Sequence, residues 1–471
     1  MELPKEFTAR MEKMLGGEYA DFLECMDHPH FRGIRRNSLK CGEDTLCRGL
    51  GVVWDPVPFS GLSSYLPAEY EHIGNHPLHH AGAFYVQEPS ASSAVTALDP
   101  HPGDRVLDLC AAPGGKSTQI AALLDGKGLL WSNEIVKNRA SILLSNIERM
   151  GIRNAVVSSC HPEVLCERFA GCFDKVLVDA PCSGEGMFRR DPQAVSEWSP
   201  EHVQACAARQ LAILESASQA VREGGILVYS TCTFSMEENE GVIAAFLRDH
   251  DFVLEEIPQK FGRPGFGDFP QTRRIFPMDG GEGHFVARMR RLSGGSGEFP
   301  SYGGAKPDAL HAAEELYCSI FGEKPQQEIA QVGDRLLLLP EGTPALSGLG
   351  VLRAGVLLGL VKKGRIEPEH ALFAAAQKED LVQCLDYAHD SPEIAAFLHG
   401  EELEADGKGY LGVCVDGITL GFGKASGGRL KNRYPKGLRA CGGQNAPAPS
   451  GRPAGCTIGP YCPRCSLCIR R

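Results

Sequence analysis

Two cysteines follow short apolar segments, at points where the strands of a sheet would end and reactive side chains could be exposed. The apolar run 175–178 has the composition of a buried strand and is followed by Asp179 and then Cys182. The run 226–229 has the same character and is followed by Cys232. Open α/β sheets bind their ligands beyond the carboxyl ends of the strands. The sequence therefore predicts that both thiols and the Asp179 carboxyl group meet at one edge of a sheet.

Thiols in this setting suit covalent catalysis on a pyrimidine. Carbon 5 of cytosine is a weak nucleophile, but a thiolate that adds to carbon 6 makes an enamine whose carbon 5 can attack a methyl sulfonium. A carboxyl group near N3 and N4 would hold the base, and Asp179 is placed for that role. The second thiol could serve as a base for the C5 proton. A lone loop cysteine is usually inert, but two at adjacent strand ends with an acid between them favour this chemistry.

A third strand end carries a turn of small residues. The strand 106–109 is followed by CAAPGGK (110–116), a loop that lets a ligand approach the backbone ahead of a helix N-terminus. A Walker loop would need glycine where Cys110 stands, and the pattern G-x-G-x-x-G is absent. Glu134 ends the next strand, where an acid holds ribose hydroxyls, and Arg139 could orient it. A nucleoside cofactor without a pyrophosphate fits this pattern, as S-adenosylmethionine does, although purely structural turns would also explain it.

Alternating strands and helices from residue 101 to about residue 291 would position these loops. Such alternation is typical of an α/β fold with a doubly wound, mostly parallel sheet. The predicted strands are 105–109, 128–132, 155–158, 174–178, 225–230 and 283–289, and the predicted helices are 116–124, 136–150 and 201–222.

The 471 residues are too many for one ordinary core, so several domains are expected. Composition divides the chain into an N-terminal cap of residues 1–80, the α/β domain 81–291 and a flexible linker 292–308. Residues 309–439 form a small α+β or β-barrel-like module whose Asp-Gly turn at 416–417 predicts a hairpin. The tail 440–471 is expected to be disordered. Its Cys462, Cys465 and Cys468 could also be part of a zinc site completed by Cys456 or Cys441, but no metal is assigned.

Charge and cysteine usage limit the classes of protein. The net charge of −11 argues against a nucleic-acid partner for the chain as a whole, yet residues 420–439 hold six basic and no acidic residues. Smaller basic clusters, which could be solvated faces, stand at 32–36, 288–291 and 362–365. Eighteen cysteines, mostly isolated, indicate reduced thiols in a cytoplasm. We expect no signal peptide, no membrane span and no obligate protein partner.

Three motifs resemble the Nop/Sun family of RNA cytosine-5 methyltransferases, and the resemblance runs from about residue 35 to residue 439. They are DAPCSGEGMFR (179–189), YSTCT (229–233) and CAAPGGK (110–116). GEGHF (281–285) and LKNRYPKGLR (430–439) look like the bacterial branch that modifies 16S ribosomal RNA. That branch implies a Rossmann-like methyltransferase sheet, a small N-terminal α+β RNA-binding cap and a C-terminal PUA-like RNA-binding module. It also implies 16S rRNA as partner, naked or within the small subunit.

The resemblance assigns roles to the site residues. Cys232 is implied to be the nucleophile and Cys182 to assist release of the methylated base, whereas DNA cytosine methyltransferases use the Pro-Cys cysteine. The implied cofactor is S-adenosylmethionine, contacted by Cys110, Ala111, Ala112, Pro113, Gly114, Gly115, Lys116, Glu134, Arg139 and Asp179.

One departure from the family concerns the third strand end. Many relatives carry an aspartate there that contacts adenine, whereas this chain has SSCHP at 158–162. Either a backbone group replaces that carboxylate or the cofactor affinity differs. Two alternatives for function stay open. The substrate could be tRNA, or the protein could be a non-catalytic RNA-binding factor in ribosome assembly.

Overall fold

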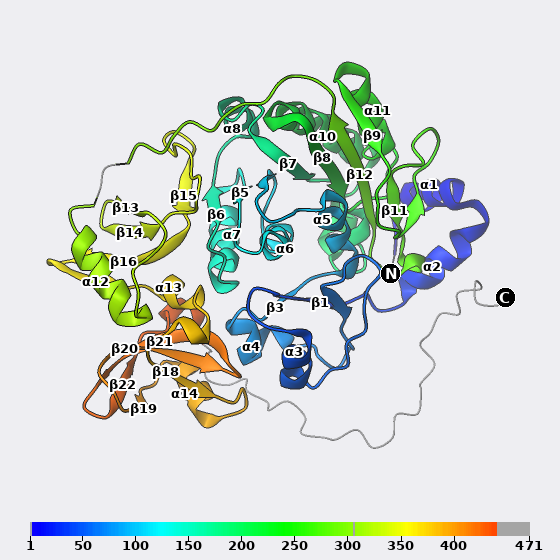
Figure 1. The fold of residues 1–471 in the computed structure, drawn as a ribbon. Coiled ribbons are helices and arrows are strands. Elements are labelled where there is room, and N and C mark those ends of the chain that lie inside the picture. The colour runs from blue at the N-terminus through cyan, green and yellow to red at the C-terminus, as the bar shows by residue number, and fades with distance from the viewer. Residues whose placement is uncertain (1, 305–306, 440–471) are drawn as a thin grey trace.

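The computed structural model describes residues 2–304 and 307–439, and the predicted cysteine-containing tail lies outside them. A ten-stranded sheet forms its centre, in the order β10-β11-β12-β8-β7-β4-β5-β6-β15, with β9 paired to β12 (Figure 1). Five strands in the middle of this sheet run parallel to one another. They are β4 (Arg105–Asp108), β5 (Leu129–Asn133), β6 (Ala155–Ser158), β7 (Phe173–Asp179) and β8 (Val221–Thr231).

The remaining strands pair antiparallel at the two edges, so the predicted parallel character holds for the middle of the sheet. One edge contains β9 (Phe252–Glu255), β10 (Arg263–Pro264), β11 (Arg273–Ile275) and β12 (His284–Arg291). The other edge is β15 (Val351–Ala354), which belongs to the C-terminal part of the chain and pairs with β6. The sequence predicted this strand inside a separate C-terminal module, because local composition does not reveal its partner.

Helices cover both faces of the central sheet, as a doubly wound fold requires. On one face, apolar side chains of α5 (Ser93–Leu98), α6 (Gly115–Leu124) and α7 (Lys137–Arg149) pack on the strands. On the other face lie α8 (Pro162–Arg168), α10 (Pro200–Ala220) and α11 (Glu240–Asp249). The strands between them are almost continuously apolar because both of their faces are buried.

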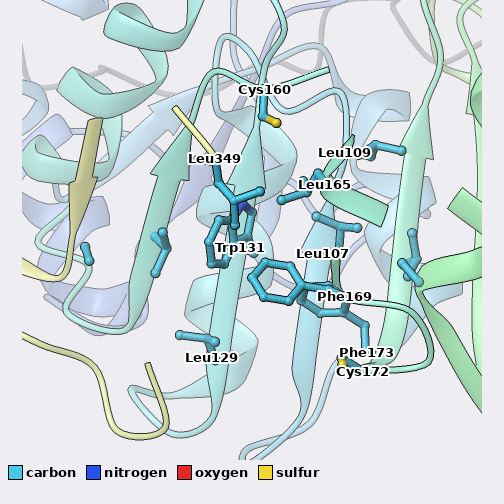
Figure 2. Close-up of a cluster of buried hydrophobic side chains, with 14 of the residues drawn as sticks. Leu107, Leu109, Leu129, Trp131, Cys160, Leu165, Phe169, Cys172, Phe173 and Leu349 are labelled. Carbon is cyan, nitrogen blue, oxygen red and sulfur yellow. The ribbon is translucent and has the colours of Figure 1, made fainter. Parts of the chain in front are cut away.

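The hydrophobic core on the face covered by α8, α10 and α11 also includes side chains from the chain that follows the central sheet. Phe299, in the predicted linker, places its ring 5.0 Å from Phe169 and 5.2 Å from Phe173. Figure 2 shows Leu349, which precedes β15, beside the buried Trp131. The linker is therefore packed against the central sheet at Phe299, although its glycines predicted a flexible segment.

The N-terminal cap touches two parts of the molecule. Its helices α1 (Lys5–Leu15) and α2 (Tyr19–Asp27) share a core with Phe188 and Phe234, which lie in the cysteine loops. The three-stranded sheet β2-β1-β3 follows, with α3 (Glu43–Leu50) and α4 (Pro77–His80), and shares another core with the C-terminal part. The strands are β1 (Gly33–Arg36), β2 (Ser63–Tyr65) and β3 (Phe84–Val86).

The C-terminal part contains two small sheets. The first follows α12 (Leu310–Phe321) and has the order β13-β14-β16-β17, and the second has the order β18-β20-β21-β22-β19 (Figure 1). Their strands are β13 (Ile329–Val332), β14 (Arg335–Leu338), β16 (Val356–Lys362), β17 (Arg365–Pro368), β18 (Cys384–Tyr387), β19 (Leu403–Glu404), β20 (Gly409–Val415), β21 (Ile418–Ser426) and β22 (Arg429–Asn432), with helices α13 (His370–Ala374) and α14 (Pro392–His399). The predicted Asp-Gly hairpin joins β20 to β21.

Candidate functional site

The two cysteine loops lie side by side because β7 and β8 are parallel neighbours, with Asp179 in register with Ser230. The sulfur atoms of Cys182 and Cys232 are 3.1 Å apart. Gly186 crosses the second loop closely, since its N–H donates to the carbonyl of Cys232 at 2.9 Å. A Cβ at that position would lie 3.0 Å from the same carbonyl oxygen, so the close crossing depends on glycine.

Cys182 keeps its proton in this arrangement. A hydrogen bond to Cys232, followed by burial, raises the pKa of Cys182 well above its ordinary value. The neutral S–H group of Cys182 can therefore donate to the Cys232 sulfur. Such a pair can supply a nucleophilic thiolate and a second thiol within reach of the same carbon atoms.

A carboxylate and an ammonium group lie beside the sulfurs. The Nζ of Lys116 is 2.7 Å from Oδ2 of Asp179, and the Ser230 hydroxyl donates to Oδ1 at 2.8 Å. Burial by itself would raise the pKa of Asp179, but Lys116 and then His284 hold it below its usual value. Asp179 is thus an ionised acceptor at the edge where the sequence predicted it. Lys116, which the family resemblance implied to be a cofactor contact, uses its ammonium group to bind Asp179.

His284 adds an imidazole to this edge, and sequence reasoning gave it no role. Its Nε2 lies 3.9 Å from Oδ1 of Asp179 and has no hydrogen-bond partner among the described residues. Burial, with Lys116, lowers the pKa of His284 to about 4, so the ring is neutral near pH 7. The histidine follows a glycine in the GEGHF motif, which was the one sequence signal that could have pointed to it.

The turn 110–116 lies between β4 and α6 and is fixed from several sides. Gly114 has a φ of +114°, and a Cβ there would lie 3.2 Å from Leu143, so the turn requires glycine. Asn146 of α7 donates to the Pro113 carbonyl at 2.9 Å. Burial raises the pKa of the Cys110 thiol above its usual range, which leaves this cysteine uncharged.

Glu134 and Arg139 form the ion pair that the sequence suggested. Arg139 Nη1 lies 3.2 Å from Glu134 Oε2, and Arg139 Nη2 donates to the Ala112 carbonyl at 3.1 Å. The arginine therefore links the carboxylate to the glycine turn. Ile135, the next residue after Glu134, is 52% exposed and offers an apolar surface beside it. A carboxylate can bind the ribose hydroxyls of a nucleoside, and an apolar side chain can pack against its base.

The loop that lacks the family's aspartate is covered by the C-terminal part of the chain. Ser159 N–H donates to the Gly350 carbonyl at 2.9 Å. A Cβ on Gly350 would lie 2.3 Å from the Ser159 carbonyl oxygen, so the two backbones meet closely. Cys160 N–H donates to Asn133 Oδ1 at 3.0 Å. The loop is therefore shaped by these hydrogen bonds at the place where the family resemblance led us to expect a carboxylate.

Arg35 supports the same turn from the cap, and sequence reasoning placed it differently. It was counted in a basic cluster that could be a solvated face, but it is 1% exposed. Its guanidinium donates to the Gly115 carbonyl at 2.6 Å and also to Thr118. The sequence could not show this burial because the partners lie more than 75 residues away along the chain.

The part of the chain that the structure describes contains neither a side-chain cluster for a metal ion nor a membrane-spanning helix. Within residues 2–304 and 307–439, no group of three or more His, Cys, Asp or Glu side chains could hold a metal ion. No helix in that same part of the chain is long and apolar enough to cross a membrane.

Four family descriptions match this chain in consecutive segments. The largest, 16S rRNA methyltransferase RsmB/F, matches residues 95–290. The N-terminal domain of 16S rRNA methyltransferase RsmF matches residues 3–89. The RsmF rRNA methyltransferase first C-terminal domain matches residues 313–375, and the methyltransferase RsmF PUA domain matches residues 384–440.

Whole-length relatives agree with these segments. The chain is 33% identical to ribosomal RNA small subunit methyltransferase F of Vibrio cholerae, over 93% of this chain and 98% of the relative. It is also 33% identical to the protein of the same name in Aeromonas hydrophila, over 93% and 97% of the two chains.

Two solved structures from Pyrococcus horikoshii are also similar. A methyltransferase homolog protein has a TM-score of 0.56 and 31% identity over 61% of this chain and 95% of its own. NSun6 with SFG has a TM-score of 0.55 and 25% identity over 62% and 99% of the two chains.

Proposed function

This chain belongs to the RsmF family of 16S rRNA methyltransferases, and we propose that it methylates carbon 5 of a cytosine in 16S ribosomal RNA with S-adenosylmethionine as the methyl donor. The observation that carries the proposal is the 3.1 Å contact between the Cys182 and Cys232 sulfurs beside the Asp179 carboxylate. Two thiols and a carboxylate at one strand edge supply a nucleophile, a base and a group that holds the pyrimidine.

In the proposed reaction, the Cys232 thiolate adds to carbon 6 of the flipped-out cytosine, and carbon 5 becomes nucleophilic. Asp179, ionised and held by Lys116, accepts hydrogen bonds from the Watson–Crick edge of the base. S-adenosylmethionine, when bound, supplies an electrophilic methyl group. The C5 proton then leaves, the bond between carbon 6 and sulfur breaks, and Cys232 regains its electron pair.

Cys182 is suited to accept that C5 proton. Its pKa is raised first by its hydrogen bond with Cys232, so the thiol stays protonated while Cys232 is free. Once Cys232 is bonded to carbon 6, its sulfur is a neutral thioether, which accepts a hydrogen bond much more weakly than a thiolate does. Cys182 can then release its proton to solvent and act as the base.

The cofactor is proposed to lie along the turn 110–116, with its ribose on Glu134 and its base against Ile135. The exposed Ile135 fits such a ligand, since its side chain presents apolar surface beside Glu134. Arg139 would orient Glu134. Asp179 and residues 110–116 complete the proposed set of contacts.

The expected effect of Glu134→Ala is weaker cofactor binding. Loss of the hydrogen bonds that ribose hydroxyls donate to a buried carboxylate costs roughly 10- to 100-fold in affinity. Titration calorimetry with S-adenosylmethionine measures the dissociation constant directly. Glu163→Ala is the matched control, because Glu163 is an exposed acid in the first turn of α8. Equal loss of affinity in the two variants would contradict the assignment of Glu134.

The expected effect of Asp179→Asn is slower methyl transfer without loss of the fold. Asparagine keeps the size of the side chain but removes the charge that pairs with Lys116, and its amide donates where the base also donates. We expect single-turnover methylation to slow by about 100-fold or more. A methylation rate unchanged from wild type would remove Asp179 from the proposed mechanism.

The RNA partner and the location of the protein are part of the proposal. Of the basic residues of segment 420–439, Lys424 lies on β21, Lys431 lies on β22 and Arg433 follows β22, and these three are exposed. Lys424 Nζ lies 5.3 Å from the Tyr410 ring centre, so cation and aromatic surface are presented together. We propose that this surface contacts rRNA and that the protein works in the cytoplasm, where bacterial small subunits are assembled.

The proposal is tested by mass spectrometry of RNA after incubation with methyl-labelled cofactor. Label on 5-methylcytosine in 16S fragments is expected, with naked 16S RNA and isolated small subunits compared as substrates. Label confined to tRNA would show that tRNA, rather than 16S rRNA, is the substrate. RNA binding without any label would favour a non-catalytic assembly factor.

A further inference from the structure

A buried carboxylate lies behind both cysteine loops. Glu238 has no exposed surface, and its Oε2 accepts a hydrogen bond from the Ser183 N–H at 2.9 Å. Its Oε1 accepts from the Ser183 hydroxyl and from the Thr233 hydroxyl at 3.4 Å. Ser183 follows Cys182 directly and Thr233 follows Cys232 directly. The Glu238 side chain therefore binds both Ser183 and Thr233, the residues that follow the two cysteines.

The carboxylate is itself held from the helix and strand beneath it. Gln210 of α10 donates through Nε2 to Glu238 Oε2 at 2.8 Å and to the Pro181 carbonyl at 3.0 Å. The Tyr229 hydroxyl of β8 lies 3.0 Å from Gln210 Oε1 and 2.6 Å from the Glu238 carbonyl oxygen. These groups are fully buried, so the network links the body of the fold to the loops without intervening solvent.

Burying Glu238 in this network lowers the free energy of unfolding, so a contribution to stability does not explain why the carboxylate is there. Among the described residues, none forms an ion pair with Glu238, and burial raises the pKa of this carboxyl despite its four donors. An unpaired buried carboxylate is expensive, whereas an apolar side chain would fill the space without that cost. The feature that an apolar side chain could not provide is simultaneous hydrogen bonding to both loops.

We propose that Glu238 is a positioning residue that joins the two cysteine loops and thereby sets the distance over which Cys182 acts on the Cys232 adduct. It does not touch the substrate. Its effect on the sulfurs passes through Ser183 and Thr233, whose hydroxyls also lie 2.9 Å from each other. The kinetic consequence rests on the function proposed above, but the geometric consequence concerns the two thiols alone.

The geometric part is tested by oxidising the full-length protein with diamide. Two thiols become a disulfide, and their two electrons and two protons reduce the diazene to a hydrazine. Peptide mapping by mass spectrometry follows the cross-link between Cys182 and Cys232. We expect Glu238→Ala to slow its formation by about tenfold or more, because the sulfurs separate. Glu237→Gln is the matched control, since that neighbouring acid is 36% exposed and binds Arg10 of the cap instead.

The kinetic part uses labelled 16S RNA. We expect Glu238→Ala to accumulate a denaturant-resistant protein–RNA adduct and to lose about 100-fold in multiple-turnover rate, because misplacement of Cys182 slows proton removal. Glu238→Gln should recover most of the rate, because its amide oxygen can accept from the Ser183 N–H while the two hydroxyls rotate to accept from its NH₂ group. A purely structural role would lower thermal stability in both variants without adduct accumulation.

Two results would overturn the proposal: a wild-type rate of disulfide formation in Glu238→Ala, or normal turnover in that variant. If Glu238→Ala does not fold, Thr233→Val removes one link while keeping the side-chain shape, and a wild-type disulfide rate in it would overturn the proposal equally. If the wild-type protein does not methylate cytosine, the proposed function fails, yet the disulfide measurement still decides the role of Glu238.

Discussion

Replacing Cys232 with alanine is expected to abolish both methyl transfer and the covalent adduct. Without a nucleophile to add to carbon 6, carbon 5 of cytosine stays unreactive toward a methyl sulfonium, and losing the nucleophile costs about 10³-fold or more in rate. Single-turnover transfer of labelled methyl groups to 16S RNA measures this loss. Cofactor binding should stay at the wild-type level, because the side chain of residue 232 is not in the turn 110–116.

The Cys232→Ala variant also tests which of the two cysteines attacks carbon 6. The Cys182 and Cys232 sulfurs are 3.1 Å apart, so distance alone does not decide which one attacks. The surroundings of Cys182 separate the two, because a hydrogen bond to Cys232, followed by burial, raises the pKa of Cys182 well above its ordinary value and disfavours its thiolate. If Cys182 were the attacking group, as in DNA cytosine methyltransferases, Cys232→Ala would still form an adduct. Cys318→Ala, a change in α12 outside the two loops, serves as the control for loss of a thiol.

Replacing Cys182 with alanine is expected to have a different outcome, namely a protein trapped on its RNA. Addition to carbon 6 and methyl transfer still occur, but no base remains within reach of the C5 proton, so the bond from carbon 6 to Cys232 persists. A denaturing gel with labelled RNA should show a slowly migrating band that survives detergent. Most of the protein should enter this band within one turnover.

The double variant Cys182→Ala/Cys232→Ala gives the decisive comparison. It should form no band, which would show that the trapped bond is to Cys232. A Cys182→Ala protein that turns over like wild type would mean that another group removes the proton. The neutral imidazole of His284, whose Nε2 lies 3.9 Å from Asp179 Oδ1, would then be the first candidate for that base, and His284 the next residue to mutate.

Local sequence was enough to predict the meeting of the cysteine loops. Parallel strands of a doubly wound sheet end at one edge, so Asp179, Cys182 and Cys232 could be placed near one another from strand patterns alone. The Glu134–Arg139 pair was predictable for a similar reason, because its members lie about one helical turn apart along the chain. The choice of Cys232 rather than Cys182 as the nucleophile came from the family motifs rather than from spacing.

What the sequence could not show depends on contacts between distant segments. Arg35 was counted in a basic cluster that could be a solvated face, yet it is buried against Thr118 because the cap folds over the turn 110–116. The strand β15 was predicted in a separate module, yet it extends the central sheet through β6.

Chain order by itself determined which loops carry sulfur, carboxylate and glycine, since periodicity and turn composition are properties of neighbouring residues. The tertiary structure alone decided how those loops are held, because Glu238, Gln210 and Arg35 act across the fold through hydrogen bonds that no local pattern specifies.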